Sequence, residues 1–485
     1  MVKQIINFKK GVSALLAISM LACTLAACSK GGTTSNKGDN KNEDNSSSSG
    51  AQTLNIGNPS ALGAESDADS VLPVISLMTD SGKAVTTKEY EGTTVSISGA
   101  TEEECNFSDK TAQIKCRGNH SFKSVDKKSY RVKFDEKINL FNQGRGAAKS
   151  WVLMAEHCDQ SFLRNHLAFA MAQKLDKIAY TTSSSFVHLY INDKYQGIYR
   201  VAEQHQIQES RVDITEDPDT VDTDYFIEWD AYADEDGNVE GLNYFEAGEN
   251  KFLVKSDYMT EEKCAFLQDY FQKANDAIAG GGKREIEKYI DLDSFIDMYI
   301  LQECAKNIDV GWSSFFFVKT AGGKISCTCP WDFDLGFGND HRLDDGSHEN
   351  IYVGNSEYTF GWGSLDQGNE WFAYLMRNKW FVDKVITRWN AVKSDLEKTA
   401  LDEAERIYGH FGDEITRNFT VWKIFGKRIN QEPDAIRAYR SYSEHVEHLM
   451  LWVENRFEWL GDYFSDKNTK YLTTEYEEHQ WKPWW

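Results

Sequence analysis

Cysteine and basic residues are both scarce in this chain, and each scarcity excludes a class of protein. Nine cysteines occur in 485 residues, and those beyond Cys28 form an odd, scattered set that does not suit a disulfide framework in a chain this long. Cys327 and Cys329 are separated by one residue, whereas zinc knuckles and redox motifs have a two-residue spacer, so we assign no metal to sulfur. The formal net charge is −23 and no basic cluster stands out, so no nucleic-acid partner is expected.

Several nucleotide- and metal-binding signatures are also missing. The chain has no Walker motif and no GxGxxG loop, and His341-Arg342-Leu343-Asp344 lacks the flanking strands that an HRD catalytic loop requires. An EF-hand fails as well, because with Gly237 at the sixth loop position the first and twelfth positions are Tyr232 and Asn243. The sequence therefore does not predict a P-loop enzyme, a typical protein kinase or an EF-hand protein.

The long apolar run of the chain lies near its N-terminus. Lysines precede an uncharged run over 11–27, which is short for a membrane span and ends at Leu25-Ala26-Ala27-Cys28. This pattern predicts a bacterial lipoprotein signal over residues 1–28 with lipid attached to Cys28, although Cys23 offers a second, poorer site. Residues 29–68 are rich in Ser, Gly and Asn and are expected to form a disordered tether. We therefore expect an exported protein, lipid-anchored on the outer face of the bacterial cytoplasmic membrane, at the cell surface.

The remainder of the chain divides into a strand-rich and a helix-rich part. Strand-like runs dominate residues 69–230, and helical periodicity dominates residues 231–485. We expect an α+β fold with a strand-rich N-terminal lobe, a helix-rich C-terminal lobe and a cleft between them. The expected strands are Val71–Met78, Thr93–Ser98, Gln113–Arg117, Lys128–Phe134, Phe186–Ile191 and Gln196–Ala202, and the expected helices are Ser161–Leu175, Glu261–Ala279, Arg284–Asn307, Trp371–Tyr408 and Pro433–Phe464.

A cluster of carboxylates surrounds one predicted β-hairpin. A strand-like run over 314–318, a Gly322-Gly323 turn and the segment Pro330-Trp331-Asp332-Phe333-Asp334 follow one another, which is typical of a hairpin. A hairpin brings its ends together, so Asp309 and Asp332 should meet in space. Alternation along the strand lets Asp332 and Asp334 project to one side. Three carboxylates so close repel one another unless a cation or a donor-rich ligand lies between them, which predicts a site for a cation and a phosphate.

The strand-rich part offers a second, weaker signal. The segment over 116–121, Cys-Arg-Gly-Asn-His-Ser, interrupts a strand and is followed by Lys127 and Lys128. A glycine turn between strands lets backbone N–H groups approach a phosphate, and a nearby lysine supplies a point charge. Alone, the segment is an ordinary hairpin with a solvated basic face.

Taken in order, these segments resemble the spore-coat protein H (CotH) kinase-like family over roughly residues 70–345. The matching pieces are Arg117-Gly118-Asn119 with Ser121, Lys127-Lys128-Ser129-Tyr130, Trp151-Val152-Leu153, Leu163-Arg164-Asn165, Val187–Ile191, Gly197-Ile198-Tyr199 with Glu203, Asn307-Ile308-Asp309, and Pro330-Trp331-Asp332-Phe333-Asp334 ending in Gly336-Phe337-Gly338. The ordered set is far more specific than any single piece.

The resemblance implies an atypical protein-kinase fold, which transfers the γ-phosphoryl group of ATP to Ser or Thr of protein substrates with Mg or Mn. Asp309 matches the catalytic aspartate of the family, which accepts the proton of the attacking hydroxyl. Asp332 matches its metal-binding aspartate, and Asp334 would add a second ligand.

The resemblance also implies a nucleotide site in the strand-rich part. Lys128 is the predicted phosphate-pairing lysine, with Lys127 and Lys133 as rivals. Arg117 and Asn119 would line the phosphate loop, and Glu203 falls near the position where a linker between lobes would meet the adenine.

One departure keeps other functions open. Family members often carry an Asn a few residues after the catalytic aspartate as a second metal ligand, whereas this chain has Ser313 and Ser314, and a serine hydroxyl is a poorer ligand for a hard cation. A kinase-fold surface or coat scaffold with weak or no activity is therefore the alternative. A glycoside hydrolase or carbohydrate-binding protein is the third, supported by paired acids and fourteen Trp, and a basic residue facing the aspartates would argue against it.

Overall fold

The computed structural model describes residues 72–142, 146–342, 344–354 and 370–465. The predicted signal peptide with Cys28 and the predicted tether over 29–68 lie outside these ranges. Among the residues that the structure describes, no helix combines the length and apolar character needed to cross a membrane.

Seven strands of the first part close into a barrel, an arrangement that the sequence did not predict. Their order around the barrel is β1-β2-β3-β4-β5-β7-β6, and the seam is closed by parallel pairing of β1 with β6. Alternate residues fill the interior with Val, Ile, Leu and aromatic side chains. The strands are β1 (Val74–Thr79), β2 (Glu91–Ser98), β3 (Phe107–Arg117), β4 (Ser129–Ile138), β5 (Ala148–Met154), β6 (Ser184–Ile191) and β7 (Lys194–Glu203).

The chain enters the barrel at a point with several fixed partners. The Leu72 N–H donates to Glu414 Oε2 at 3.3 Å, and the His188 N–H donates to the Pro73 carbonyl at 2.9 Å. His188 Nε2 lies 2.8 Å from the same Glu414 Oε2. The residues just before β1 are therefore attached both to β6 and to the helix that carries Glu414.

A second sheet spans the predicted boundary at residue 230, because β8 lies in the strand-rich part and its other four strands lie in the part predicted to be helix-rich. It has the strand order β12-β11-β8-β10-β9 and contains the predicted hairpin, in which β11 and β12 pair antiparallel. The hairpin prediction is confirmed, and β8 to β10 were not predicted. The strands are β8 (Tyr225–Trp229), β9 (Tyr244–Ala247), β10 (Asn250–Val254), β11 (Phe315–Lys319) and β12 (Ile325–Thr328).

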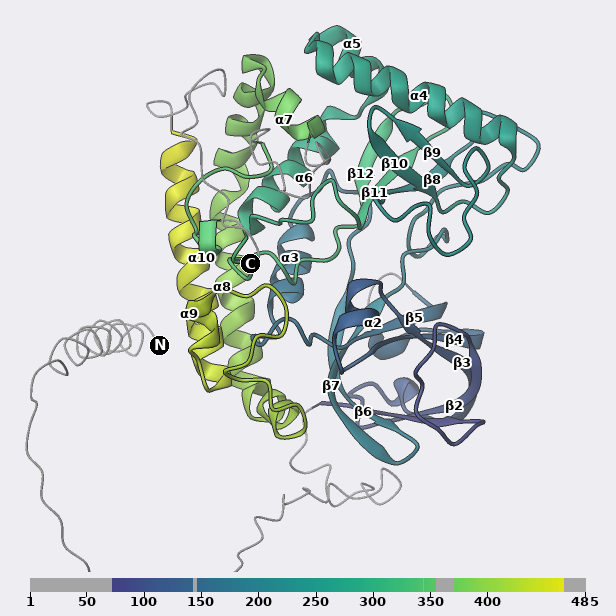
Figure 1. The fold of residues 1–485 in the computed structure, drawn as a ribbon, viewed down its shortest axis with the longest axis vertical. Coiled ribbons are helices and arrows are strands. Elements are labelled where there is room, and N and C mark those ends of the chain that lie inside the picture. Colours follow the sequence, from purple (N-terminus) through teal and green to yellow (C-terminus); the bar gives the residue numbers. More distant parts are fainter. Residues whose placement is uncertain (1–71, 143–145, 343, 355–369, 466–485) are drawn as a thin grey trace, which may run out of the picture. The chain divides into compact units, whose positions relative to one another are not determined.

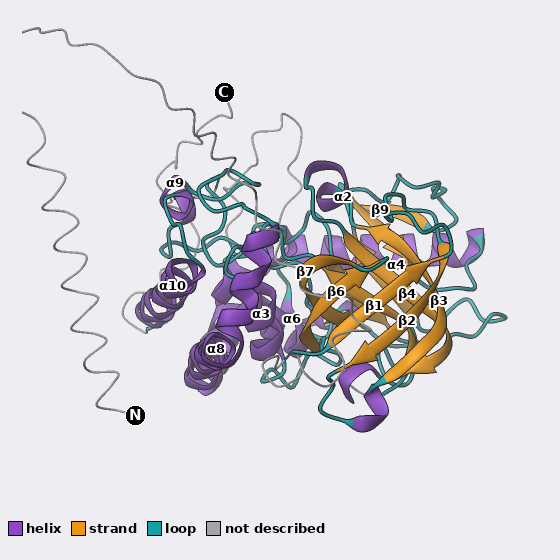
Figure 2. Cartoon of the chain, turned by 90° about the horizontal axis from the view of Figure 1, so that it is seen from below, coloured by secondary structure: helices purple, strands orange, loops and turns teal. Residues whose placement is uncertain are grey.

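The helices agree with the predicted periodicity, but three of the predicted helices are each divided in two. Breaks fall at 290–291, 377–378 and 438–441, and the helices that follow them begin after the N-cap residues Asp291, Asn378 and Ser441. α8 contacts α3, α6, α10 and strand β7, and Figures 1 and 2 show α3, α8 and α10 side by side. The helices are α2 (His120–Ser124), α3 (Arg164–Ala172), α4 (Glu261–Gly280), α5 (Lys283–Tyr289), α6 (Leu292–Ala305), α7 (Glu370–Met376), α8 (Lys379–Val421), α9 (Asp434–Arg437) and α10 (Tyr442–Tyr463), with short 3-10 turns η2 (Glu103–Cys105), η3 (Leu140–Asn142) and η4 (Asp344–Gly346).

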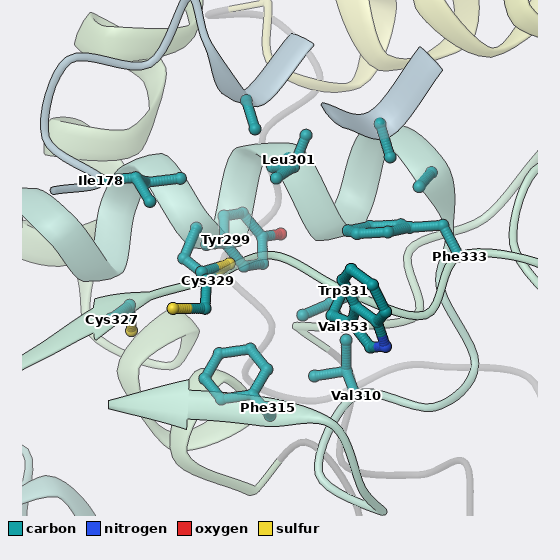
Figure 3. Packing of buried hydrophobic residues seen from close by; sticks show 14 of the residues in the cluster. Ile178, Tyr299, Leu301, Val310, Phe315, Cys327, Cys329, Trp331, Phe333 and Val353 are labelled. Atoms are coloured by element: carbon teal, nitrogen blue, oxygen red, sulfur yellow. The ribbon is translucent and has the colours of Figure 1, made fainter. Parts of the chain in front are cut away.

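The larger hydrophobic core lies between the second sheet and the helices and extends to the predicted site. Figure 3 shows Trp331 and Phe333 packed among buried residues such as Tyr299 and Val353. Cys327 and Cys329 are buried in the same cluster, and no disulfide joins any two of the seven cysteines within the described residues, all of which are buried. The expectation that sulfur binds no metal stays a prediction.

Candidate active site

One cavity brings together predicted site residues from both parts of the chain. Its volume is about 1110 Å³, and its walls come from the outer face of β3–β5 and from the sheet that contains β8 and β11. Asp309, Asp332 and Asp334 line it, and so do Arg117 and Asn119. The carboxylates and the phosphate loop, which lie roughly 200 residues apart in sequence, therefore share one hollow.

The backbone around Asp332 is held from two sides. Trp331 and Phe333 are buried, and the Phe333 N–H donates to Asn165 Oδ1 of α3 at 2.9 Å. Asn307 Nδ2 donates to the Asp332 carbonyl at 3.2 Å. Asp332 itself has φ +66°, a left-handed conformation that is uncommon outside glycine. Such conformations persist where the surroundings fix them, as these partners do.

Ser314 lies directly against the predicted metal ligand. Its hydroxyl donates to Asp332 Oδ2 at 3.0 Å, and its backbone has φ +59°. The position at which the family often carries Asn is therefore in contact with Asp332, and the Ser314 hydroxyl is hydrogen-bonded to one of the two Asp332 carboxylate oxygens.

The three carboxylates are crowded in a partly buried place. Burial and the Asp332 carboxylate raise the pKa of Asp309 to about 7, while the Arg342 guanidinium opposes that rise. Burial, Asp332 and Asp309 raise the pKa of Asp334 well above its usual range. Both shifts come first from burial and then from the neighbouring carboxylates.

The loop after β3 requires its glycine. Gly118 has φ +92°, and a Cβ built on it would lie 2.2 Å from Ser121 Oγ. Asn119 follows at the start of α2, where its Oδ1 accepts a hydrogen bond from Lys88 Nζ at 2.9 Å. The Arg117 guanidinium lies 5.5 Å from the Trp331 ring centroid. Burial lowers its pKa, whereas Asp332 favours its charged form.

The structure distinguishes the three candidate lysines. Lys128 is not part of the cavity lining, and its ammonium donates to the carbonyls of Phe122 and Val125. Lys127 is fully buried; it donates to Asn418 Oδ1 at 2.9 Å and to two carbonyls. Burial lowers the pKa of Lys127 well below its usual range. Lys133 is exposed and lines the cavity. The structure thus leaves Lys133 as the candidate lysine with an ammonium free to meet a ligand.

Glu203 is placed away from the cavity. Its carboxylate is fully buried and accepts hydrogen bonds from Tyr180 Oη at 3.1 Å and the Ser183 N–H at 3.0 Å, with Arg211 Nε 3.8 Å away. The residues that follow it, 204–208, do line the cavity. The segment after Glu203 therefore borders the cavity, whereas the Glu203 carboxylate is hydrogen-bonded within the protein and does not line the cavity.

The comparisons with known proteins agree with this geometry. A family model described as CotH kinase protein matches residues 114–460. The chain belongs to the CotH kinase protein family. The inner spore coat protein H of Bacillus subtilis (strain 168) is 26% identical over 235 residues, which cover 47% of this chain and 59% of that protein. The chain thus spans less than two thirds of the length of this CotH relative.

The donor set of this CotH chain suits a hard divalent cation that is shared with phosphate. Among the described residues, no group of three or more His, Cys, Asp or Glu side chains is close enough to hold a metal. Mg²⁺, however, is commonly bound by one or two carboxylates together with substrate phosphates. Asp332 and Asp334 provide such a pair, and their mutual repulsion would be relieved by a cation. The residues present therefore fit a metal whose other ligands come from the substrate.

The sequence prediction missed the number of cations around the cavity. Lys115, Arg131, Lys137 and Lys149 line it in addition to Arg117 and Lys133. A partial signal was present, since Lys115 and Arg117 on one strand, like Arg131 and Lys133 on the next, are two residues apart and so share a face. The pairing of β3 with β4 then places Lys115 opposite Arg131.

Proposed function

We propose that this CotH-family chain is a kinase-like phosphotransferase, which moves the γ-phosphoryl group of ATP to Ser or Thr hydroxyls of protein substrates with Mg²⁺ or Mn²⁺. The observation that carries the proposal is the shared cavity of Asp309, Asp332 and Arg117. Phosphoryl transfer depends mainly on positioning and charge neutralisation, and these groups can provide a proton acceptor, a cation site and a phosphate partner.

Each residue has a distinct role in the proposed reaction. Asp309 accepts the proton of the attacking hydroxyl, a role supported by its place beside Asp332 in the cavity. Arg342 beside it favours its charged form. Asp332 and Asp334 hold the divalent cation, which when bound neutralises charge on the phosphates. Arg117 pairs with phosphate oxygens, and the Gly118 turn lets the backbone approach them.

A two-lobed kinase-like arrangement belongs to the same proposal. The barrel would take the place of the nucleotide-binding lobe, and the second sheet with its helices would carry the carboxylates. The lipid anchor at Cys28 and the location on the outer face of the membrane are proposed from the sequence pattern alone.

A kinase-fold scaffold without transfer is the second candidate. The contact between Ser314 and Asp332 favours it, because the serine occupies a carboxylate oxygen and offers a poorer ligand than Asn. The carbohydrate alternative is weakened, because Arg117 and Arg342 face the aspartates, and cations beside an acid pair suit phosphate better than a glycosidic bond.

The deciding experiment is phosphate incorporation measured by intact-mass spectrometry. Full-length protein is incubated with ATP, Mg²⁺ or Mn²⁺ and an unstructured Ser/Thr-rich protein, beside an Asp309→Asn variant. Increments of about 80 Da that are absent from the variant are expected for phosphoryl transfer. If there is no increment but ATP still raises the melting temperature, the scaffold candidate is favoured. Absence of both effects would reject the nucleotide site.

A further inference from the structure

Three barrel strands carry six cations that point into or border the cavity. Lys115 and Arg117 lie on β3, Arg131, Lys133 and Lys137 on β4, and Lys149 on β5. They alternate with Ile114, Cys116, Val132 and Phe134, which fill the barrel interior. We call these six residues the basic strip. The alternation of a strand places the five residues of β3 and β4 on the side away from the interior core. Lys149 does not follow this alternation: it is the second residue of β5, on the side of Trp151 and Leu153, but it is exposed at the strand end and lines the cavity.

The basic strip is unusual because its cations form no salt bridges in the described part of the chain, although Asp332 and Glu228 act on Arg117 and Glu89 and Asp236 on Lys115 over longer distances. Many Lys and Arg side chains of this acidic protein pair with carboxylates. Within the described ranges, none of the six forms an ion pair, and the buried Arg131 Nε has no hydrogen-bond partner. Arg131 repels both Lys115 and Arg117, which contributes to lowering the pKa of each. A wall of unpaired, mutually repelling cations in a cavity suits an anion.

The strip runs along the strands away from the carboxylates. The register pairs Arg117 with Ser129, Lys115 with Arg131 and Gln113 with Lys133. At about 3.3 Å per residue, Lys133 lies roughly 13 Å along the strands from Arg117, which is beside the carboxylates. Lys137 and Lys149 follow at the far end. The cavity volume of about 1110 Å³ also exceeds the range of roughly 300–1,000 Å³ that is typical of small-molecule sites.

We propose that Lys133, Lys137 and Lys149 dock an acidic segment of the protein substrate, whose carboxylates or phosphoserines lie about four to six residues from the acceptor hydroxyl. This inference rests on the proposed function, since it places the acceptor at Asp309 and the nucleotide phosphates at Arg117. The spacing follows from the distance of roughly 13 Å between the two ends, because an extended peptide advances about 3.3 Å per residue.

The negative net charge of the chain does not contradict an acidic partner. Exposed charges separated by more than about 8 Å are largely screened at physiological ionic strength, so the strip determines local binding. Several acidic residues of the cavity form salt bridges with cations outside the strip: Glu228 with Lys255, Asp236 with Lys88 and Glu156 with Arg200. Binding should weaken as salt is raised, because the three lysines are exposed.

The test measures peptide binding separately from catalysis. Full-length protein in detergent is titrated into a fluorescent peptide with one central serine and glutamates four to six residues on either side, and binding is followed by anisotropy. Companion peptides carry glutamine, lysine or phosphoserine in place of glutamate. The K133Q/K137Q/K149Q variant is compared with a K174Q/K194Q/K324Q control, which removes the same charge from exposed lysines outside the cavity.

We expect the glutamate or phosphoserine peptide to bind at least about tenfold more tightly than the glutamine peptide, and the cavity variant, unlike the control, to lose this preference. Equal binding to the cavity variant and the wild type overturns the inference, and so does tighter binding of the lysine peptide. Binding of an oligothymidylate as tight as that of the glutamate peptide would replace the inference with a general polyanion site. The rise in melting temperature with ATP reports on the nucleotide site alone. If ATP causes no such rise but the wild type still prefers the glutamate peptide, the proposed function is rejected and the docking surface is retained.

Discussion

Replacing Ser314 by Asn tests the departure of this chain from its family. Ser314 has φ +59°, a conformation that costs most L-residues about 1–2 kcal/mol but that Asn adopts readily. The substitution also removes a hydroxyl hydrogen bond to Asp332, which contributes about 0.5–1.5 kcal/mol. These two effects oppose each other, so the free energy of unfolding should change by less than about 1 kcal/mol.

The functional expectation is larger than the effect on stability. Asn places an amide oxygen, a good ligand for Mg²⁺, beside Asp332. Residues that support a metal site commonly change its affinity by about 10–100-fold, so half-maximal phosphate transfer should need about tenfold less Mg²⁺. The assay is phosphate transfer as a function of Mg²⁺ concentration, with denaturant unfolding of the same samples. Ser313→Asn, one residue away in the same cavity, is the matched control.

Two results would refute this reasoning. A well-folded Ser314→Asn variant with the Mg²⁺ dependence of the wild type would show that position 314 is not a ligand position. A loss of more than about 2 kcal/mol in the free energy of unfolding would contradict the backbone argument, since no steric or conformational penalty is expected for Asn there.

Three further outcomes are expected. Gly118→Ala should abolish the rise in melting temperature caused by ATP and cost about 1–2 kcal/mol in unfolding free energy, because φ is +92° and the new Cβ meets a serine hydroxyl at 2.2 Å. Asn165→Asp should be less stable than the wild type at pH 7, because the amide that donates to Glu156 Oε2 at 3.2 Å is replaced by a second carboxylate. The difference in stability should be much smaller at pH 4.5, where protonation relieves the repulsion between the two carboxylates. A difference in urea midpoint that is independent of pH would contradict this. Burial lowers the pKa of His205 and His445 to about 3, so the unfolded chain binds more protons than the folded chain below pH 6.5. The free energy of unfolding should therefore fall by about 1.4 kcal/mol per histidine per pH unit as the pH drops from about 6.5. Urea midpoints between pH 7.5 and 5 measure that slope, which should flatten when either histidine is replaced by Asn.

The sequence predicted local features of the fold well because they depend on local patterns. The Gly322-Gly323 turn between two apolar runs indicated the hairpin of β11 and β12, and that hairpin was enough to bring Asp309 to Asp332. The breaks between α5 and α6 and between α7 and α8 were missed, although Asp291 and Asn378 are residue types that commonly begin a helix. Barrel closure depends on pairing between β1 and β6, more than a hundred residues apart, and no local pattern reports it.

The site was predicted less completely than the hairpin, for a reason of geometry. Lys127 and Lys128 are neighbours, and the choice between them required knowing which carbonyls surround each ammonium. Glu203 ends a strand that was correctly predicted, yet its side chain turns toward Tyr180 and away from the cavity. The basic strip is spread over 115–149 and becomes a cluster only when β3, β4 and β5 lie side by side.

The attachment of the chain at Leu72 has a mechanical consequence. A pull on the residues before it acts first on the bonds to Glu414 and on the parallel pairing of β1 with β6. A load along a parallel pair shears several backbone hydrogen bonds at once, which resists force better than opening them one after another. The cavity is lined mainly by other strands, so a force applied through the N-terminal segment would be borne at the β1–β6 seam and by α8 before it reached Asp309 or Asp332.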